Sequence, residues 1–235
     1  MRVCVAARKG GVGKSSVVAG LASLLAADGR RVLAVDLDPQ SNLAFMLGVS
    51  PTAPGTAQLL GGLRPAPLCA WPNLDVLPGG PELARQDIAR LDPEDLGDAL
   101  RGFDYDDILF DCPPGSEHLE RLGVVASTKA LVITNAHPIA VVGASRVLDD
   151  LQVRRDKGRK GPGSWALVLN MLDVRRSLDR DVEVMLGSVE ASVPRFRIKQ
   201  DAQLAMATAQ GTPLAELSSS PAVQALQAVK EWCLG

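Results

Sequence analysis

Residues 9–16 read KGGVGKSS, and this segment constrains the fold more than any other feature of the chain. A short apolar run at residues 3–7 precedes the glycines, and a helix-length apolar stretch at residues 15–28 follows them. Glycines let the backbone curl so that successive N–H groups point inward, and the helix N-terminus adds the positive end of its dipole. A strand, a glycine-rich loop and a helix in this order predict a loop that cradles phosphate groups.

Short apolar runs alternate with helix-length stretches along most of the remaining chain. Such runs are typical of buried strands, which need helices on both faces of a mostly parallel sheet. We therefore expect an α/β fold with a doubly wound sheet, and ligands at the carboxyl ends of its strands. The expected strands are residues 3–7, 31–35, 74–77, 107–110, 130–134 and 165–169, and the expected helices are residues 15–28, 117–126, 139–155 and 177–189.

The composition favours one soluble domain that spans residues 1–235. Hydrophobic residues make up 46% of the chain, which is enough to bury a core at this length. The longest nearly apolar run, residues 17–27, is shorter than the roughly 20 residues that cross a bilayer, and the N-terminus lacks the pattern of a signal peptide. We expect a cytoplasmic protein, with a loop-rich segment at residues 51–81, where seven of the 16 prolines lie.

Charge and cysteine content exclude several classes of function. The four cysteines are far apart and lack the ligand spacing of a zinc site. Aromatic residues are only 3% of the chain, too few for the stacking surfaces that bind single-stranded nucleic acids. The net charge of −2 excludes a bulk polycation, but residues 146–199 hold 12 basic and 8 acidic residues, which predicts a local basic face.

Several polar side chains have the chemistry that a bound nucleotide requires. Lys14 can bridge the β- and γ-phosphates, and the hydroxyl of Ser15 can ligate Mg²⁺. Asp36 and Asp38 follow a predicted strand, and alternate residues there point the same way, so both should lie beside the loop. Asp111 ends another predicted strand. Asp36 and Asp38 are expected around a metal ion and a water molecule.

The start of the loop departs from the common pattern, which would have glycine at position 8 and here has Arg8 followed by Lys9. A lysine at this place, in xKGGxGK[ST], resembles the deviant phosphate loop of the ParA/MinD family of dimeric ATPases. The resemblance implies the P-loop NTPase fold and covers nearly the whole chain in order. It also rests on VLAVDLDPQSNLA (residues 32–44), ILFDCPPG (108–115), LVLNMLD (167–173) and VPRFRIKQDA (193–202).

The resemblance implies ATP or ADP with Mg²⁺ as cofactors and a homodimer in the ATP state. Lys9 would reach the phosphates of the partner subunit, Asp38 would position the attacking water, and Asp36 and Asp111 would support Mg²⁺ together with Ser15. Asn170 would contact the adenine, and Pro194 would begin the other segment beside the base. The implied cofactor-binding residues are Lys9, Gly10, Gly11, Val12, Gly13, Lys14, Ser15, Ser16, Asn170 and Pro194.

Three functions within the family remain open. The first is a ParA-type partition ATPase that binds nonspecific double-stranded DNA as a dimer, associates with the nucleoid, and is stimulated by a ParB-like partner. The loop begins at residue 9, which leaves no room in this sequence for an N-terminal helix-turn-helix domain, so we expect no sequence preference. The implied DNA-binding residues are Arg175, Arg176, Arg195, Arg197 and Lys199.

The second function is a MinD-like positioning ATPase at a membrane, and the third is a metabolic ATPase or ligase. Membrane binding would need a C-terminal amphipathic helix with a basic polar face. Residues 221–235 carry only Lys230 and Glu231 as charged residues, and their apolar positions have the spacing of a packing helix. We therefore expect no membrane partner. The spacing of the cysteines disfavours an iron–sulfur protein, whereas a ligase stays open.

Overall fold

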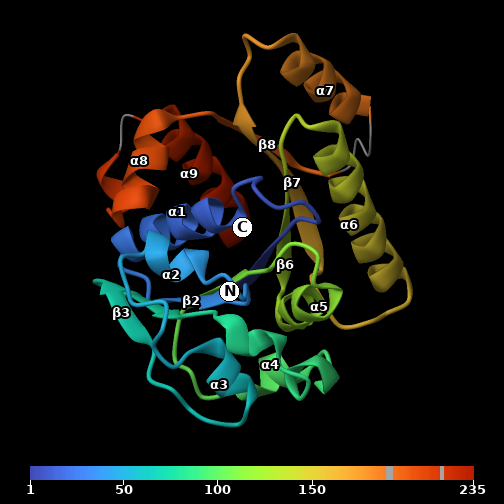
Figure 1. Cartoon of the computed structure of the whole chain (residues 1–235). Coiled ribbons are helices and arrows are strands. Elements are labelled where there is room, and N and C mark those ends of the chain that lie inside the picture. The colour runs from blue at the N-terminus through green and yellow to red at the C-terminus, as the bar shows by residue number, and fades with distance from the viewer. Residues whose placement is uncertain (189–192, 218–219) are drawn as a thin grey trace.

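The computed structural model describes residues 1–188, 193–217 and 220–235. Its strands form one eight-stranded sheet in the order β3-β4-β2-β5-β1-β6-β7-β8, and all neighbouring pairs are parallel except β3 with β4 (Figure 1). This is the expected α/β fold with a mostly parallel sheet. The strands are β1 (Arg2–Ala6), β2 (Val32–Asp36), β3 (Leu68–Trp71), β4 (Leu74–Leu77), β5 (Asp107–Asp111), β6 (Lys129–Thr134), β7 (Ser164–Leu172) and β8 (Arg195–Lys199).

Helices cover both faces of the sheet, and Figure 1 shows α1, α8 and α9 on one side of β7 and α6 on the other. Short 3₁₀ turns lie at Pro81–Ala84, Ile88–Arg90 and Leu214–Glu216. The α-helices are α1 (Lys14–Ala27), α2 (Asn42–Met46), α3 (Thr56–Leu60), α4 (Asp95–Ala99), α5 (Glu117–Ala126), α6 (Pro138–Asp156), α7 (Ser177–Ser188), α8 (Ala202–Gln210) and α9 (Pro221–Leu234). The last residue of the helix predicted at 177–189 lies outside the described residues.

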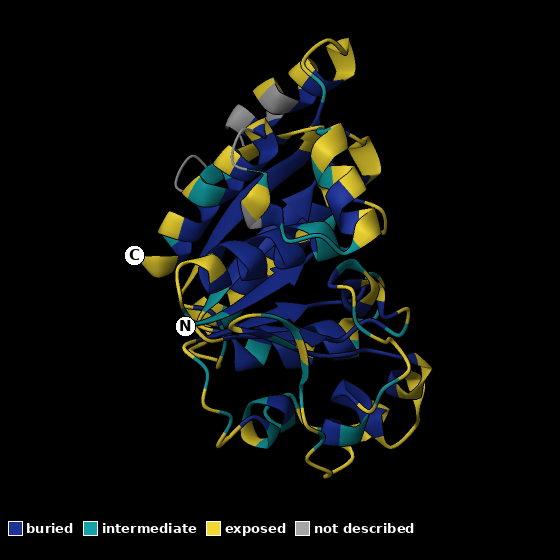
Figure 2. Cartoon of the chain, turned by 90° about the vertical axis from the view of Figure 1, so that its left-hand side faces the viewer, coloured by how far each residue is buried: buried dark blue, intermediate teal, exposed yellow. Residues whose placement is uncertain are grey.

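The sheet separates two hydrophobic cores because successive side chains of each strand point to opposite faces. In β1, Val3 and Val5 pack with α1 and α9, whereas Cys4 and Ala6 pack with α5 and α6. Figure 2 shows the central strands buried between helices whose outer surfaces are exposed. Burial on both faces explains why the central strands read as continuous apolar runs.

Side-chain caps fix the starts of several helices. The Ser116 hydroxyl accepts a hydrogen bond from Leu119 N at 3.4 Å at the start of α5. Asp201 accepts hydrogen bonds from the backbone N–H groups of Gln203 and Leu204 at the start of α8. Each cap satisfies N–H groups that have no partner within the helix.

The C-terminal segment forms the packing helix that its spacing predicts. The side chains of Val223, Leu226, Val229 and Cys233 on α9 are buried against α1 and β8. Within the part of the chain that the structure describes, no helix has both the length and the apolar character needed to cross a membrane.

Candidate nucleotide-binding site

The glycine-rich loop connects β1 to α1 at the carboxyl edge of the sheet. Gly11 and Gly13 have φ angles of 75° and 87°, in the left-handed region that favours glycine. Gly13 is also the N-cap of α1, and a side chain there would collide with the amide of Asn170. The first turn of α1 contains no acidic residue, so its own sequence does not neutralise the positive end of the helix dipole.

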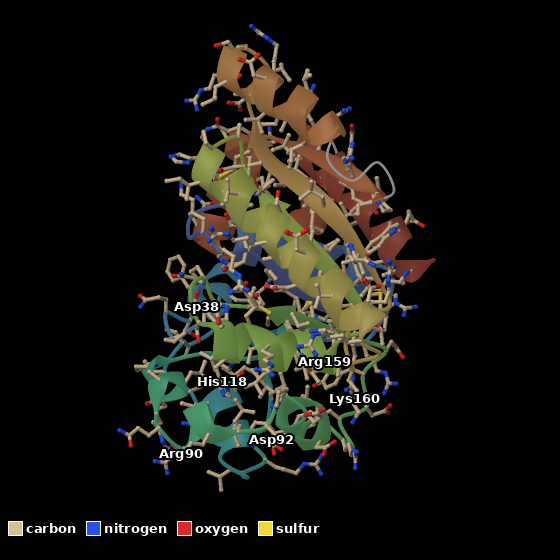
Figure 3. The ribbon with its side chains drawn as sticks, turned by 90° about the vertical axis from the view of Figure 1, so that its right-hand side faces the viewer. Asp38, Arg90, Asp92, His118, Arg159 and Lys160 are labelled. Carbon is tan, nitrogen blue, oxygen red and sulfur yellow. The ribbon has the colours of Figure 1, made fainter. Side chains whose placement is uncertain are left out.

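This loop forms one wall of a cavity of about 590 Å³. Lys14 and Ser15 line the cavity from the start of α1, and Asp38, labelled in Figure 3, lines it from the segment after β2. Pro114, from the segment after β5, lies against the loop close to Gly10. The structure therefore brings together segments that are about 100 residues apart in the sequence.

Two carboxylates lie side by side behind this cavity. Asp36 and Asp111 are register partners on β2 and β5, and both are almost completely buried. The oxygens of Asp36 accept hydrogen bonds from Asp38 N at 2.8 Å and from Leu43 N at 3.2 Å. Neither carboxylate oxygen of Asp111 accepts a hydrogen bond of standard geometry from any residue that the structure describes.

Burial raises the pKa of both carboxyl groups. The pKa of Asp36 lies well above its usual value because of burial and the neighbouring charge of Asp111. The hydrogen bonds from the two backbone N–H groups lower the pKa of Asp36 but do not outweigh these two effects. Burial raises the pKa of Asp111 to about 7, although the Ser15 hydroxyl and the Lys14 ammonium group favour its charged form. Two like charges in this buried position are costly unless a cation lies nearby.

The residues at this place fit a magnesium ion held together with phosphate oxygens. No cluster of three or more His, Cys, Asp or Glu side chains in the described residues is arranged to hold a metal directly. Mg²⁺ usually keeps several waters and takes one or two carboxylates plus phosphate oxygens, so it does not need such a cluster. Asp111, with two buried oxygens that lack hydrogen bonds, and the Ser15 hydroxyl at the loop match that donor set.

A second cavity, of about 1010 Å³, adjoins the loop on the side of β7 and α8. Asn170 lines this second cavity and Met171 lines both cavities, at a bulge where the pairing of β7 with β8 shifts its register. The amide Nδ2 of Asn170 donates to Val12 O at 2.8 Å, so this side chain anchors the phosphate loop. The predicted contact of Asn170 with a base stays a prediction.

Pro194 does not line either cavity. Its carbonyl accepts a hydrogen bond from Leu167 N at 2.9 Å at the beginning of β8. β8 follows Pro194 and runs parallel to β7. The chain therefore reaches the second cavity only at the far end of β8, where Lys199 and Gln200 line it. The segment beside the second cavity is thus the end of β8 together with α8, and the predicted place of Pro194 at the start of a segment beside the base stays a prediction.

Comparisons with known proteins agree with this geometry. A family model described as an AAA domain matches residues 1–160. The chromosome-partitioning ATPase Soj of Thermus thermophilus is 34% identical over 189 residues, which cover 79% of this chain and 75% of that protein. The chain belongs to the ParA/Soj family of phosphate-loop ATPases.

Solved structures of proteins related to the ParA/Soj family have the same fold. Apo McdA of Cyanothece superposes with a TM-score of 0.87 at 23% identity, over 100% of this chain and 99% of that one. The septum site-determining protein MinD of Pyrococcus horikoshii, solved with Mg-ADP, superposes with a TM-score of 0.78 at 26% identity, over 98% of this chain and 94% of that one.

In this ParA/Soj family member, Lys9 and Lys14 lie in different environments. The Lys14 side chain is buried at the phosphate cavity, whereas Lys9 is not among the residues that line it. Lys9 instead lines a groove of about 460 Å³ beside the start of α6. Ile139 and Val142 of α6 line the same groove, with exposed fractions of 68% and 53%.

Three of the five predicted DNA-binding residues lie on β8, and the other two lie in the turn between β7 and α7. Arg195, Arg197 and Lys199 alternate along the edge strand β8 with Phe196 and Ile198, which pack into the core. Arg175 and Arg176 lie in the turn before α7, and both are within ion-pair distance of Asp173, at 2.9 Å and 3.9 Å. Arg195 and Lys199 lie at opposite ends of β8, and DNA binding by the five residues stays a prediction.

The residues that line the second cavity from α8 were not predicted from the sequence. Leu204, Met206 and Thr208 lie in a segment whose small and polar residues do not alternate in a clear helical pattern. Asp201 carried the one signal in this segment, because an aspartate followed by a run of helix-forming residues is typical of an N-cap. Arg8 stands out in the sequence only as a departure from the loop pattern, and its contacts depend on tertiary structure.

Proposed function

We propose that this chain is an ATPase that dimerises with ATP, binds DNA without sequence preference, and positions or segregates a DNA or protein cargo. A partner of the ParB type would stimulate hydrolysis, and the chain would act as a single domain in the cytoplasm, associated with the nucleoid. The observation that carries this proposal is the separation of the two loop lysines. Lys14 lies at the phosphate cavity, while Lys9 lies beside exposed apolar residues.

Each residue of the cavity has a role in this proposal. The backbone N–H groups of residues 10–16 and the Lys14 ammonium group hold the phosphates of ATP, and Ser15 and Asp111 hold Mg²⁺. The metal ion supplies charge neutralisation between the β- and γ-phosphates. Asp36 accepts backbone N–H groups on both oxygens, which holds the segment of Asp38 in position.

Asp38 is the group that orients water for attack on the γ-phosphate. Its Oδ1 accepts a hydrogen bond from Gln40 N at 2.9 Å, and this contact fixes the carboxylate at the wall of the cavity. No described residue donates a hydrogen bond to its Oδ2, which is therefore available to a water molecule. Replacement of Asp38 should leave the phosphate cradle intact.

The dimer is the second part of the proposal. Ile139 and Val142 are large apolar side chains exposed next to Lys9, and a second subunit would cover them. Lys9 would then contribute its charge to the phosphates of the partner subunit, as an arginine finger does in other phosphoryl-transfer enzymes. Intrinsic hydrolysis should be slow in a monomer because this charge comes from the other subunit.

Light scattering and calorimetry with ATP and Mg²⁺ test these roles. Wild type should change from monomer to dimer with ATP, Asp38→Ala should stay a dimer because hydrolysis is lost, and Lys9→Ala should bind ATP as a monomer. Lys14→Ala should bind ATP at least about tenfold more weakly, since a charge-assisted hydrogen bond is typically worth 1.5–3 kcal/mol.

The control is Lys157→Ala, which removes an exposed lysine at the far end of α6 and should dimerise like wild type. Dimerisation of Lys9→Ala at the wild-type ATP concentration would contradict the role of Lys9. Unchanged ATP affinity in Lys14→Ala would show that the loop is not the nucleotide site.

A further inference from the structure

A separate cavity, of about 430 Å³, lies between α5 and α6, and we call it the α5–α6 groove. It shares no lining residue with the phosphate cavity or with the cavity beside α8. Figure 3 views the molecule from this side and labels His118 and Arg159, which both line the groove. The other residues used here are Val124, Val147 and Leu151 on its apolar part and Arg121 and Arg154 at its basic end.

The end of the groove nearest the phosphate loop is acidic, because one guanidinium group lies there among three carboxylates. Arg8 lies 2.7 Å from Asp150, 3.1 Å from Glu117 and 3.7 Å from Glu120, measured between guanidinium nitrogens and carboxylate oxygens. These contacts join the loop to both helices. Asp150 lies one helical turn before Arg154 on α6, but it forms its ion pair with Arg8 and not with Arg154.

The opposite end holds three arginines that have no such partners. In the part of the chain that the structure describes, no carboxylate forms an ion pair with Arg121, Arg154 or Arg159. Among the described residues, the one side-chain hydrogen bond of these three arginines goes from Arg154 Nη1 to the carbonyl of Lys160, at 2.8 Å. A neutral carbonyl orients Arg154 but does not balance its charge.

The three charges are close enough to disfavour one another. Burial lowers the pKa of Arg154, and the charges of Arg121 and Arg159 lower it further, while Glu94 and Asp150 act in the opposite direction. A group of like charges at the end of a cavity costs free energy, and an anion bound among them would remove that cost. Guanidinium groups bind phosphate and carboxylate oxygens in a bidentate geometry.

We propose that the α5–α6 groove binds a small molecule that carries a phosphate group, held by Arg121, Arg154 and Arg159. The size of the groove favours a small molecule, because ligand pockets typically have volumes of about 300–1,000 Å³. Val124, Val147 and Leu151 provide an apolar surface for the organic part of such a molecule. The site does not depend on the proposed function of the phosphate loop.

Phenyl phosphate is a suitable probe because it combines a phosphate group with an apolar ring. The protein is first saturated with ADP and Mg²⁺ so that the phosphate loop is occupied, and binding is then measured by calorimetry. Wild type should bind phenyl phosphate with a Kd of about 1 mM or tighter, and phenol should not bind measurably. Arg121→Gln and Arg159→Gln should each weaken the binding at least about tenfold, since each removes a charge-assisted hydrogen-bond donor.

Arg155→Gln is the matched control. Arg155 is adjacent to Arg154 on α6 and has the same charge, but its guanidinium group stacks on Trp165, 4.6 Å from the ring centre, and it does not line the groove. This variant should bind phenyl phosphate like wild type. An equal loss in Arg155→Gln would show that general surface charge attracts the anion, and would overturn the proposal.

A thermal-stability measurement distinguishes binding from a structural role. Without phosphate, Arg121→Gln should melt at the wild-type temperature or above, because it removes one of three mutually repelling charges. With phenyl phosphate, wild type should gain stability and Arg121→Gln should not. The proposal is overturned if wild type does not bind phenyl phosphate at about 10 mM, or if a DNA duplex binds through these arginines and phenyl phosphate does not.

Discussion

At the scale of single residues, the nucleotide site is built at the expense of stability. Asp36 and Asp111 lie side by side in the sheet, and no basic side chain forms an ion pair with either in the described residues. An apolar pair at these positions would be cheaper to bury. The acidic pair is therefore best explained by a cation that binds at the site and compensates its charge.

Replacing Asp111 with asparagine should stabilise the protein without metal or nucleotide. The pKa of Asp111 is raised to about 7, so the folded state binds its proton more tightly than the unfolded state does. The free energy of unfolding should therefore fall as the pH rises from about 4 to about 7. The difference from an ordinary aspartate converts to roughly 4 kcal/mol, so Asp111→Asn should be more stable by about 2–4 kcal/mol at about pH 8 and by little at about pH 4.

Urea unfolding of wild type and Asp111→Asn at both pH values measures this difference. Asp92→Asn removes the same charge from an exposed position labelled in Figure 3 and should change the free energy of unfolding by less than about 0.5 kcal/mol. If Asp111→Asn is the less stable protein at about pH 8, the buried charge is not the cost that we infer. The same variant should bind Mg²⁺ and ATP more weakly.

At the scale of elements, the sequence predicts those strands and helices that are buried in a simple pattern. β4 and α5 have the predicted bounds, and β1, β2, β5, β6, β7 and α6 differ from the prediction by a few residues at most. β3 and β8 were missed because both lie at the edges of the sheet. In β8, arginine and lysine occupy every second position, so its apolar content is too low to predict a strand.

Site residues could likewise be predicted where local sequence determines their position, and not where tertiary contacts determine it. The loop, Asp36, Asp38 and Asp111 could be placed from the sequence because each follows a strand whose direction the parallel sheet dictates. The hydrogen bond from Asn170 to Val12 could not, because it depends on the bulge at Met171, whose φ angle is 56°. The separation of Pro194 from the cavity beside α8 could not be predicted either, because β8, the strand that follows Pro194, was not predicted.

One ion pair joins α9 to α1, in addition to the apolar packing between the two helices. Lys230 of α9 is buried, and its Nζ lies 2.6 Å from Asp28, at the end of α1, and 3.7 Å from Glu231. Asp28→Asn should lower the free energy of unfolding by about 1–3 kcal/mol, because it leaves a buried ammonium group without its main partner. This value is below that of a fully buried pair, since Asp28 is 45% exposed.

Glu231→Gln is the control for this prediction, because Glu231 also approaches Lys230 but is 72% exposed. Its effect on the free energy of unfolding should stay within about 0.5 kcal/mol. Adding Lys230→Met to Asp28→Asn should recover most of the lost stability, since an apolar side chain needs no ionic partner. Equal effects of Asp28→Asn and Glu231→Gln in urea unfolding would show that the short contact contributes nothing specific.

At the scale of the whole molecule, part of the proposed basic surface lies at the same edge of the sheet as the nucleotide site. Lys199 and Arg175 line the cavity beside α8, which adjoins the phosphate loop through Ser16 and Asn170. A surface this close to the nucleotide would be duplicated when two subunits join. Two weak patches on one rigid body bind a polyanion far more tightly than one patch does.

We therefore expect the ATP-bound dimer to bind double-stranded DNA, and the monomer without nucleotide to bind it much more weakly. Neutralised phosphates release counterions, so the logarithm of the affinity should fall linearly with the logarithm of the salt concentration, at about −0.9 per neutralised phosphate. Arg197→Ala and the double variant Arg175→Ala/Arg176→Ala should weaken binding equally on two unrelated duplexes. Each should make the slope less steep by about one for every phosphate that the variant no longer neutralises, or about two in a dimer.

Arg175 already binds Asp173 through two hydrogen bonds of 2.9 Å, so DNA must compete with Asp173 for this arginine. The double variant should therefore lose less affinity than two independent arginines would account for.

Fluorescence anisotropy across a salt series, with ATP trapped by the additional change Asp38→Ala, measures these slopes. Arg90→Ala is the matched control, because Arg90 is an exposed arginine at Ile88–Arg90, far from β8 in the order of the sheet, and its removal should leave the slope unchanged. A strong preference for one duplex would indicate contacts with bases, which phosphate neutralisation alone cannot produce. Binding that is insensitive to salt, or unaffected by both variants, would exclude this surface. The absence of DNA binding in every nucleotide state would leave a protein or a membrane as the partner of the ATP dimer.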